Sequence, residues 1–442
     1  TMYITAVTAS HRPSMSRVVG TASFGTLLEY YDFLVYVALG STLRALFLPE
    51  FDPFVSSILT AGTFGVAYLA RPLGTLIFSP MSDRIGRKRA FVITLVLMGV
   101  STVLMGCLPT YESAGVFAPV CLLLLRIVQG IALGGEYGSA AVYVMEHAPR
   151  ERRGLFTSFL QSTASLGLLL ALVVVALLNV YLSTADFAAW GWRVPFLVSA
   201  PIVLVATYIR LGMEETPVFQ ALKEKGGVSR SPLADTLGSR ASWKNLLVAV
   251  FGAQGGTSVT LYTSIIYMLY FLQNVLAVPV FEANLCVGVA ILIAAPLYPL
   301  FGAVSDRYGR AWVMLIGMGL WASVAYPCFS QIVASAKIQA WPTVTACITL
   351  LAALTAMVMA PLPAFIADSF PPQSRTTGFG LSQQIGNILF GGFLPMICLA
   401  LVNWSGNPLA GIVYSIASLL PCILVAAVWG VRLDRKRSSD TQ

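Results

Sequence analysis

Five ionisable side chains interrupt long apolar stretches of this sequence, and they are the residues best placed to do chemistry there: Glu29, Asp32, Arg71, Arg126 and Glu136. A charged group inside a lipid bilayer costs several kcal/mol, so each is a functional candidate if these stretches cross a membrane. The acids could bind and release protons, and the arginines could bind an acid or an anion. Neither histidine of the chain lies in these stretches, so proton transfer there would use the carboxyl groups.

Asp32 and Arg126 are predicted to lie at a similar depth, on the first and the fourth apolar stretch. At 1.5 Å per helical residue, Asp32 lies about 12 Å and Arg126 about 15 Å below the outer surface. An ion pair would let the bilayer tolerate both charges. A carboxylate beside an arginine stays ionised, and it takes up a proton when the arginine turns to an anionic substrate. We therefore predict Asp32 as the proton site and Arg126 as the residue shared with substrate; a static structural pair is the alternative.

The other ionisable residues leave alternatives open. Glu29 lies three residues before Asp32 on the same helical face, and Tyr36 lies four residues after it. Either acid could be the coupling group, and sodium could replace the proton. Arg71 and Glu136 are predicted to form a second pair nearer the cytoplasm, which would serve as a gate, as an exit station for the substrate, or only to pack two helices.

Neutral polar side chains are predicted to complete the substrate site, because no carboxylate or arginine lies deep in an apolar stretch of the C-terminal half. A long polar group in lipid needs a partner from outside its own helix. The predicted substrate contacts, besides Arg126, are Tyr36, Gln129, Tyr137, Gln161, Gln254, Tyr262, Thr263, Tyr267, Gln383, Gln384 and Asn387.

The elements that position these residues must be membrane-spanning helices. The 442 residues are 57% apolar and 10% charged, whereas about 25% of an average soluble domain is charged. One span needs about 20 apolar residues, so twelve spans would contain nearly all of the apolar residues of this chain. This composition excludes a soluble multidomain enzyme, a disordered chain and a disulfide-stapled secreted chain. The predicted class is an all-α membrane protein with twelve transmembrane helices, at 17–40, 54–78, 90–108, 116–142, 154–180, 193–212, 245–272, 283–303, 311–331, 343–366, 378–402 and 407–431.

The basic residues predict how these helices are oriented. The net charge is +8, but 22 of the 27 Lys and Arg residues fall on one side of the predicted membrane and three on the other. This bias orients membrane helices and does not form a nucleic-acid surface, so both termini are predicted to be cytoplasmic. The predicted divisions are a cytoplasmic tail (1–16), a six-helix bundle (17–212), a cytoplasmic linker (213–244), a second six-helix bundle (245–431) and a cytoplasmic tail (432–442).

Two cytoplasmic loops repeat one pattern. SPMSDRIGRKR (79–89) follows the second predicted helix, and GAVSDRYGR (302–310) follows the eighth, with the aspartates 223 residues apart. This offset predicts two parallel six-helix repeats. The aspartates could anchor helix N-termini and pair with arginines, which would latch the two halves together when the outer side is open. The predicted gating residues are Asp83, Arg84, Gly86, Arg87, Asp306, Arg307, Gly309 and Arg310.

These loops resemble the signature loop of the major facilitator superfamily, GxxxDRxGRR, with Ser79 in place of the first glycine. LLRIVQG (124–130) is similar to the RxxQG element of that superfamily. LEYYDFLVY (28–36), RPLG (71–74), GGEYG (134–138) and FGGFLP (390–395) resemble the metabolite–proton symporter family, which includes permeases for α-ketoglutarate, shikimate, citrate and proline or betaine. The resemblance implies the major facilitator fold. It also favours the Asp32–Arg126 pair, because sugar–proton relatives pair a first-span acid with the fourth-span arginine.

The predicted function is proton-coupled symport of a small mono-, di- or tricarboxylate by alternating access. It would take place in the inner membrane of a bacterium, with a monomer among lipids as the working unit. No P-loop is present, so a proton gradient is the expected driving force, with no cofactor and no metal. No HExxH or GxSxG motif is present, so we do not expect an enzyme. The alternatives are a proton symporter for a neutral or zwitterionic solute such as betaine or proline, and a membrane sensor that does not transport.

Overall fold

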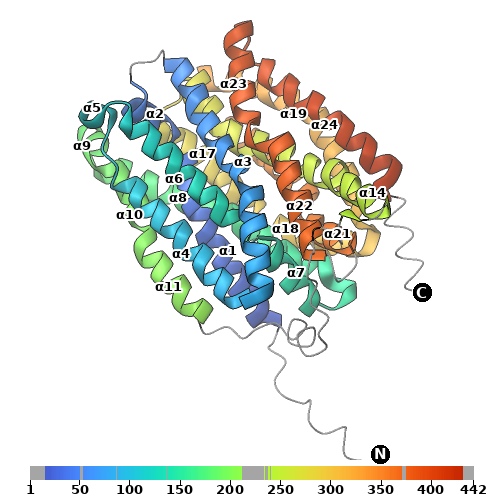
Figure 1. The fold of residues 1–442 in the computed structure, drawn as a ribbon. Helices are drawn as coiled ribbons and strands as arrows, with labels where there is room; N and C mark the ends of the chain where they lie inside the picture. The colour runs from blue at the N-terminus through green and yellow to red at the C-terminus, as the bar shows by residue number, and fades with distance from the viewer. Residues whose placement is uncertain are drawn as a thin grey trace, which may run out of the picture.

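The computed structural model describes residues 15–49, 53–85, 87–135, 137–211, 233, 237–238, 240–370 and 375–431, and the regular elements in these ranges are helices (Figure 1). Each of the twelve predicted segments contains helix, so the predicted fold class is confirmed. Eight helical stretches of the described residues are long and apolar enough to cross a membrane by themselves.

The N-terminal half is built from six main helices and helix pairs. They are α1 (Met15–Ala38), α3 (Pro53–Ile85), α4 (Arg87–Gly106), α6 with α7 (Phe117–Gly134 and Tyr137–His147), α8 (Arg153–Tyr181), and α10 with α11 (Val194–Leu197 and Ser199–Leu211). Short helices connect them at α2 (Gly40–Phe47), α5 (Tyr111–Ala114) and α9 (Thr184–Ala189). Helix α3 runs to Ile85, seven residues past the predicted end at 78, so the repeated loop begins as helix rather than as coil.

The C-terminal half repeats this plan with more interruptions. Its elements are α14 (Arg240–Ala249), α15 (Gly256–Leu261), α16 (Met268–Tyr270), α17 (Val280–Ala294), α18 (Leu297–Tyr308), α19 (Arg310–Lys337), α20 (Trp341–Met359), α21 (Leu362–Asp368), α22 (Arg375–Asn387), α23 (Leu394–Ser405) and α24 (Ala410–Val425). Wider π-helical turns link α14, α15 and α16, at Val250–Gly255 and Tyr262–Tyr267. Another follows α22, at Ile388–Gly392. Such turns often lie at functional sites.

The second copy of the repeated loop is a helix break made by one glycine. Asp306 lies in the last turn of α18, and Gly309 has a φ of 95°, which glycine adopts without steric cost. This residue ends α18, and α19 begins at Arg310. The loop therefore presents Asp306 and Arg310 one helical turn apart on either side of the break.

Close packing fixes α3 against α6. A Cβ atom at Gly130 would lie 2.0 Å from the carbonyl oxygen of Ala67, and one at Gly134 would lie 2.0 Å from that of Arg71. Side chains at these positions would push the helices apart, so the glycines allow the backbones to touch. The position of Arg71 thus depends on the fourth predicted segment.

Helices α3 and α8 carry most of the contact between the halves. Helix α8 packs on α17 and α18 of the C-terminal half, and α3 packs on α22 and α23. In Figure 1, α4, α6 and α11 lie on one side of this interface, and α14, α19 and α24 lie on the other. Most of the linker, most of the first tail and all of the second tail lie outside the described residues, so the domain boundaries stay a prediction.

Candidate substrate-binding site

A small cavity of about 50 Å³ lies between the two halves. Helices α1, α3 and α8 line it from the N-terminal half; α15 with its flanking π-helical turns and α22 line much of it from the C-terminal half. Its polar lining consists of Tyr30, Tyr68, Arg71, Gln161, Ser165, Gln254, Thr257, Ser258, Tyr262, Gln383 and Asn387. A ligand held here would touch both halves at once, which alternating access requires.

Arg71 is the one charged residue among the described residues that line the cavity. Its side chain is 3% exposed, and its guanidinium carbon lies 3.7 Å from the centroid of the Tyr68 ring and 4.7 Å from that of Phe33. The two rings hold the guanidinium by cation–π attraction. Its Nε and Nη2 atoms have no hydrogen-bond partner, so donors remain for an anion.

A neutral hydrogen-bond cluster forms the opposite wall. Gln254 donates through Nε2 to Ser258 Oγ at 3.2 Å and to Asn387 Oδ1 at 3.0 Å, and Ser258 donates to the same Asn387 oxygen at 2.9 Å. The Tyr262 hydroxyl donates to the Tyr68 hydroxyl across the interface. The π-helical turn at Val250–Gly255 contains Gln254, and the next one begins at Tyr262.

Part of the predicted substrate site is brought together in this cavity. Its predicted members are Gln161, Gln254, Tyr262, Gln383 and Asn387, joined by Arg71 from the predicted second pair. The prediction missed Tyr30 and Tyr68. Tyr68 precedes Arg71 by three residues and so shares its helical face, which is a signal that the sequence contains.

The other described candidates lie outside this cavity, and their role as substrate contacts stays a prediction. Thr263 donates to Ser415. The Tyr267 ring stacks on Phe329, and Gln384 donates to the carbonyl oxygen of Gly134. Helical polarity alone does not distinguish a side chain that faces the cavity from one that faces a neighbouring helix. The side chain of Tyr137 lies outside the described residues.

Arg126 also lies outside the cavity, fully buried within the N-terminal half. It donates to the carbonyl oxygen of Phe33 at 3.1 Å and to Gln129 Oε1 at 2.7 Å. Its guanidinium carbon lies 4.4 Å from the ring centroids of Phe33 and Tyr36. Gln129 in turn donates to Thr102 at 2.7 Å. Arg126, Tyr36 and Gln129 therefore form a network around α1 and do not contact the cavity.

Asp32 and Arg126 do not form the predicted ion pair. The Asp32 carboxyl group is 1% exposed and faces Ser199 of α11, and its Oδ1 atom has no hydrogen-bond partner. The predicted depth is close, since Arg126 bonds the carbonyl oxygen of Phe33, the next residue along α1. Depth fixes the height of a residue along a helix but not the direction of its side chain. The rings of Phe33 and Tyr36 occupy the face of α1 that Arg126 covers.

The remaining predicted acids are only partly described. Glu29 is 3% exposed, on the same helix as Asp32. Glu136 lies outside the described residues, so its pairing with Arg71 stays a prediction. The described contacts of Arg71 place it at the cavity between the halves.

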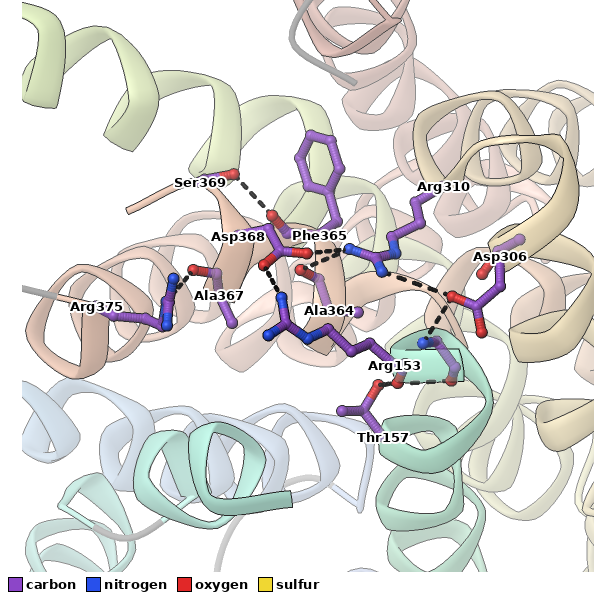
Figure 2. Close-up of polar contacts among 12 residues, drawn as sticks. Arg153, Thr157, Asp306, Arg310, Ala364, Phe365, Ala367, Asp368, Ser369 and Arg375 are labelled. Carbon is purple, nitrogen blue, oxygen red and sulfur yellow. Dashed lines mark hydrogen bonds and ion pairs between the residues drawn. The ribbon is translucent and has the colours of Figure 1, made fainter. Parts of the chain in front are cut away.

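An ionic network joins the two halves at the end of the molecule that carries Arg153, Arg310 and Arg375, here called the basic end (Figure 2). Arg153 at the start of α8 pairs with Asp368 of α21 at 3.0 Å, and Arg310 pairs with the same carboxylate. Arg310 also lies 3.5 Å from Asp306.

Asp306 reaches across the interface to the first turn of α8. It accepts hydrogen bonds from the backbone N–H groups of Gly154 at 2.8 Å and Leu155 at 2.9 Å. This is the helix anchoring expected of the repeated loop, because a carboxylate satisfies orphan N–H groups and the helix dipole. Arg307 is exposed and takes no part in these pairs. Gly86 and the side chains of Asp83, Arg84 and Arg87 lie outside the described residues.

The halves also touch at the opposite end. The ring of Tyr270 lies so close to Gly40 that a Cβ atom there would be 2.9 Å away. Phe393 approaches Gly65, and Met396 approaches Gly62, at 2.6 and 2.8 Å from the same hypothetical atom. The cavity thus has contacts between the halves on both sides of it.

Comparison with known proteins gives the family. The sequence model of the protein family described as Sugar (and other) transporter matches residues 18–240. The sequence model of the Major Facilitator Superfamily matches residues 255–442. An inner membrane metabolite transport protein of Escherichia coli (strain K12) is 32% identical over 90% of this chain and 91% of its own. The α-ketoglutarate permease of the same strain is 33% identical over 87% and 86%, and its proline/betaine transporter is 31% identical over 95% and 83%.

A solved structure confirms the architecture. The crystal structure of a D-xylose–proton symporter matches with a TM-score of 0.70 at 20% identity, over 92% of this chain and 96% of that one. At this identity the match shows the fold alone. The family models and the relatives above 30% identity show that this chain belongs to the major facilitator superfamily of membrane transporters.

Proposed function

We propose that this chain is a proton-coupled symporter that imports a small organic acid across the inner membrane of a bacterium. The observation that carries this proposal is the position of Arg71, a buried cation with unpaired nitrogens in the cavity between the halves. A guanidinium offers a carboxylate two parallel hydrogen bonds and an opposite charge. The name of one relative agrees with this proposal, because the α-ketoglutarate permease is named for an organic acid.

A second observation favours an anion. Arg71 and Arg126 both stack on the ring of Phe33, with guanidinium carbons 4.7 and 4.4 Å from its centroid. Two buried positive charges beside one ring repel each other, and an anion beside Arg71 would offset that repulsion. The cavity therefore suits a negatively charged ligand better than a neutral one.

Asp32 is the proton site in this proposal, with Glu29 as the alternative. A carboxylate buried without a cation is costly, and binding a proton removes that cost. The proton site and the anion site then lie on different sides of α1, since Asp32 faces α11 while its neighbour Phe33 stacks on Arg71. Helix α1 links them, so movement of α1 on substrate binding would couple the two events.

A second candidate is a zwitterionic solute such as betaine. The hydroxyphenyl rings of Tyr30, Tyr68 and Tyr262 line the same cavity, and aromatic rings attract quaternary ammonium groups. The similarity to a proline/betaine transporter agrees with this candidate. Arg71 would then hold the carboxylate of the zwitterion.

Uptake into proteoliposomes under an imposed pH gradient tests the proposal. The panel contains labelled mono-, di- and tricarboxylates, betaine and an uncharged polyol. We expect uptake of a carboxylate by the native chain and a large rise in its KM in Arg71→Gln. Uptake should be retained in Lys337→Gln, which removes an exposed charge at the end of α19 away from the basic end. Accumulation of the polyol alone, or full uptake of a carboxylate by Arg71→Gln, would refute the role of Arg71.

A further inference from the structure

Three buried polar atoms of the cavity wall have no hydrogen-bond partner: Gln254 Oε1, Gln383 Oε1 and Thr257 Oγ1. Their side chains belong to residues that are 4%, 5% and 2% exposed. A buried polar group without a partner costs about 1–3 kcal/mol. Two of these atoms are amide oxygens, which only accept hydrogen bonds. The wall therefore calls for a ligand that brings hydrogen-bond donors.

The side-chain nitrogen of Gln254 has two hydrogen-bond partners in this wall. Its Nε2 donates to both Ser258 Oγ and Asn387 Oδ1, and Ser258 uses its single hydrogen on Asn387. As the amides of Gln254 and Asn387 are oriented in the structure, both hydrogens of Gln254 Nε2 are committed to this cluster. The oxygen of Gln254 is the atom that remains for a ligand.

The charges of the cavity limit the ligand further. Arg71 is its one cation, and no Asp or Glu is present among the described lining residues. A second carboxylate on the ligand would bring acceptors to the amide oxygens and would find no cation there. A quaternary ammonium group has no N–H to donate. Hydroxyl groups fit this wall, because they need no second cation and they donate hydrogen bonds to the amide oxygens.

We propose that the cargo is a hydroxylated monocarboxylate: its carboxylate binds Arg71, and its hydroxyl groups donate to Gln254 and Gln383. This inference rests on the proposed transport of an organic acid and narrows it to one class. A site that hydrogen-bonds a hydroxyl group binds an analogue without that group much more weakly, because the buried acceptors are then left unpaired.

Matched acids test the proposal on the purified full-length chain. The pairs are quinate with cyclohexanecarboxylate and D-gluconate with hexanoate, beside glutarate and glycine betaine, and the readout is the Kd from isothermal titration. We expect a hydroxylated acid of at least one pair to bind about tenfold more tightly than its partner, and more tightly than glutarate or betaine. Equal affinities within both pairs, or tighter binding of glutarate or betaine, overturn this inference alone. Failure of every acid to bind overturns the proposed function as well.

Two variants test which residues distinguish a hydroxylated acid from its unsubstituted partner. In Gln254→Leu and Gln383→Leu, the ratio of the two Kd values within the selective pair should fall towards one, while the affinity for the unsubstituted acid is kept. Retained affinity also shows that the variant is folded. Gln273→Leu is the matched control, since Gln273 lies outside the cavity and donates to Asn284. An unchanged ratio in both cavity variants contradicts the assignment of these acceptors.

Discussion

At the scale of single residues, the direction of a side chain matters more than its depth. Counting along helices placed Asp32 and Arg126 at nearly the same height, and Arg126 does reach the backbone one residue beyond Asp32. It stacks on aromatic rings that fill the face of α1 between them, while the carboxyl group faces α11. Rotation about a helix axis depends on neighbouring helices, and one sequence does not contain that information.

The position of Asp32 leads to a prediction about coupling. We expect Asp32→Asn to abolish uptake driven by an imposed pH gradient, because an amide cannot bind and release the proton. Counterflow exchange of substrate should persist, because Arg71 and the cavity are untouched. Both activities are measured in the same proteoliposomes. Glu29→Gln is the matched control: if it uncouples transport and Asp32→Asn does not, the proton site is Glu29.

At the scale of elements, twelve apolar segments were enough to predict the helices, because a membrane span needs a long apolar run. The finer structure follows from packing. The π-helical turns around Gln254 and Tyr262 contain no proline, yet they contribute much of one cavity wall. The position of Arg71 could not be predicted from the sequence either, because it depends on how closely α3 approaches α6.

That approach can be tested through the glycines of α6. We expect Gly130→Leu to displace α3, because its side chain would overlap the backbone of Ala67. Substrate affinity should fall through the displaced Arg71, and the melting temperature should drop by several degrees. Gly319→Leu is the control, because a Cβ atom there meets nothing within 4 Å. Thermal unfolding in detergent and substrate titration measure the two effects; equal behaviour of both variants would contradict the packing argument.

At the scale of the whole molecule, the structure holds the halves together at both ends, and the basic end does so with charges. Asp368 receives an arginine from each half, Arg153 and Arg310, while Asp306 bonds the first turn of α8 (Figure 2). The Arg153–Asp368 pair and the bonds of Asp306 to α8 cross the interface, so they must break when the basic end opens. Apolar contacts such as Tyr270 on Gly40 cross it at the other end. The equilibrium between the two openings thus depends on the strength of the network.

Removing one carboxylate should shift that equilibrium. Asp368→Asn leaves Arg153 and Arg310 without their shared partner, and a loss of about 2 kcal/mol corresponds to roughly a thirtyfold change in population. Spin labels at Glu151 and Arg307, both exposed at the basic end, report the distance between the halves in a chain without its native cysteines. We expect a longer distance to gain population in Asp368→Asn but not in the control Asp186→Asn, which alters an exposed acid remote from the network. An unchanged distance distribution would show that the network does not hold the basic end closed.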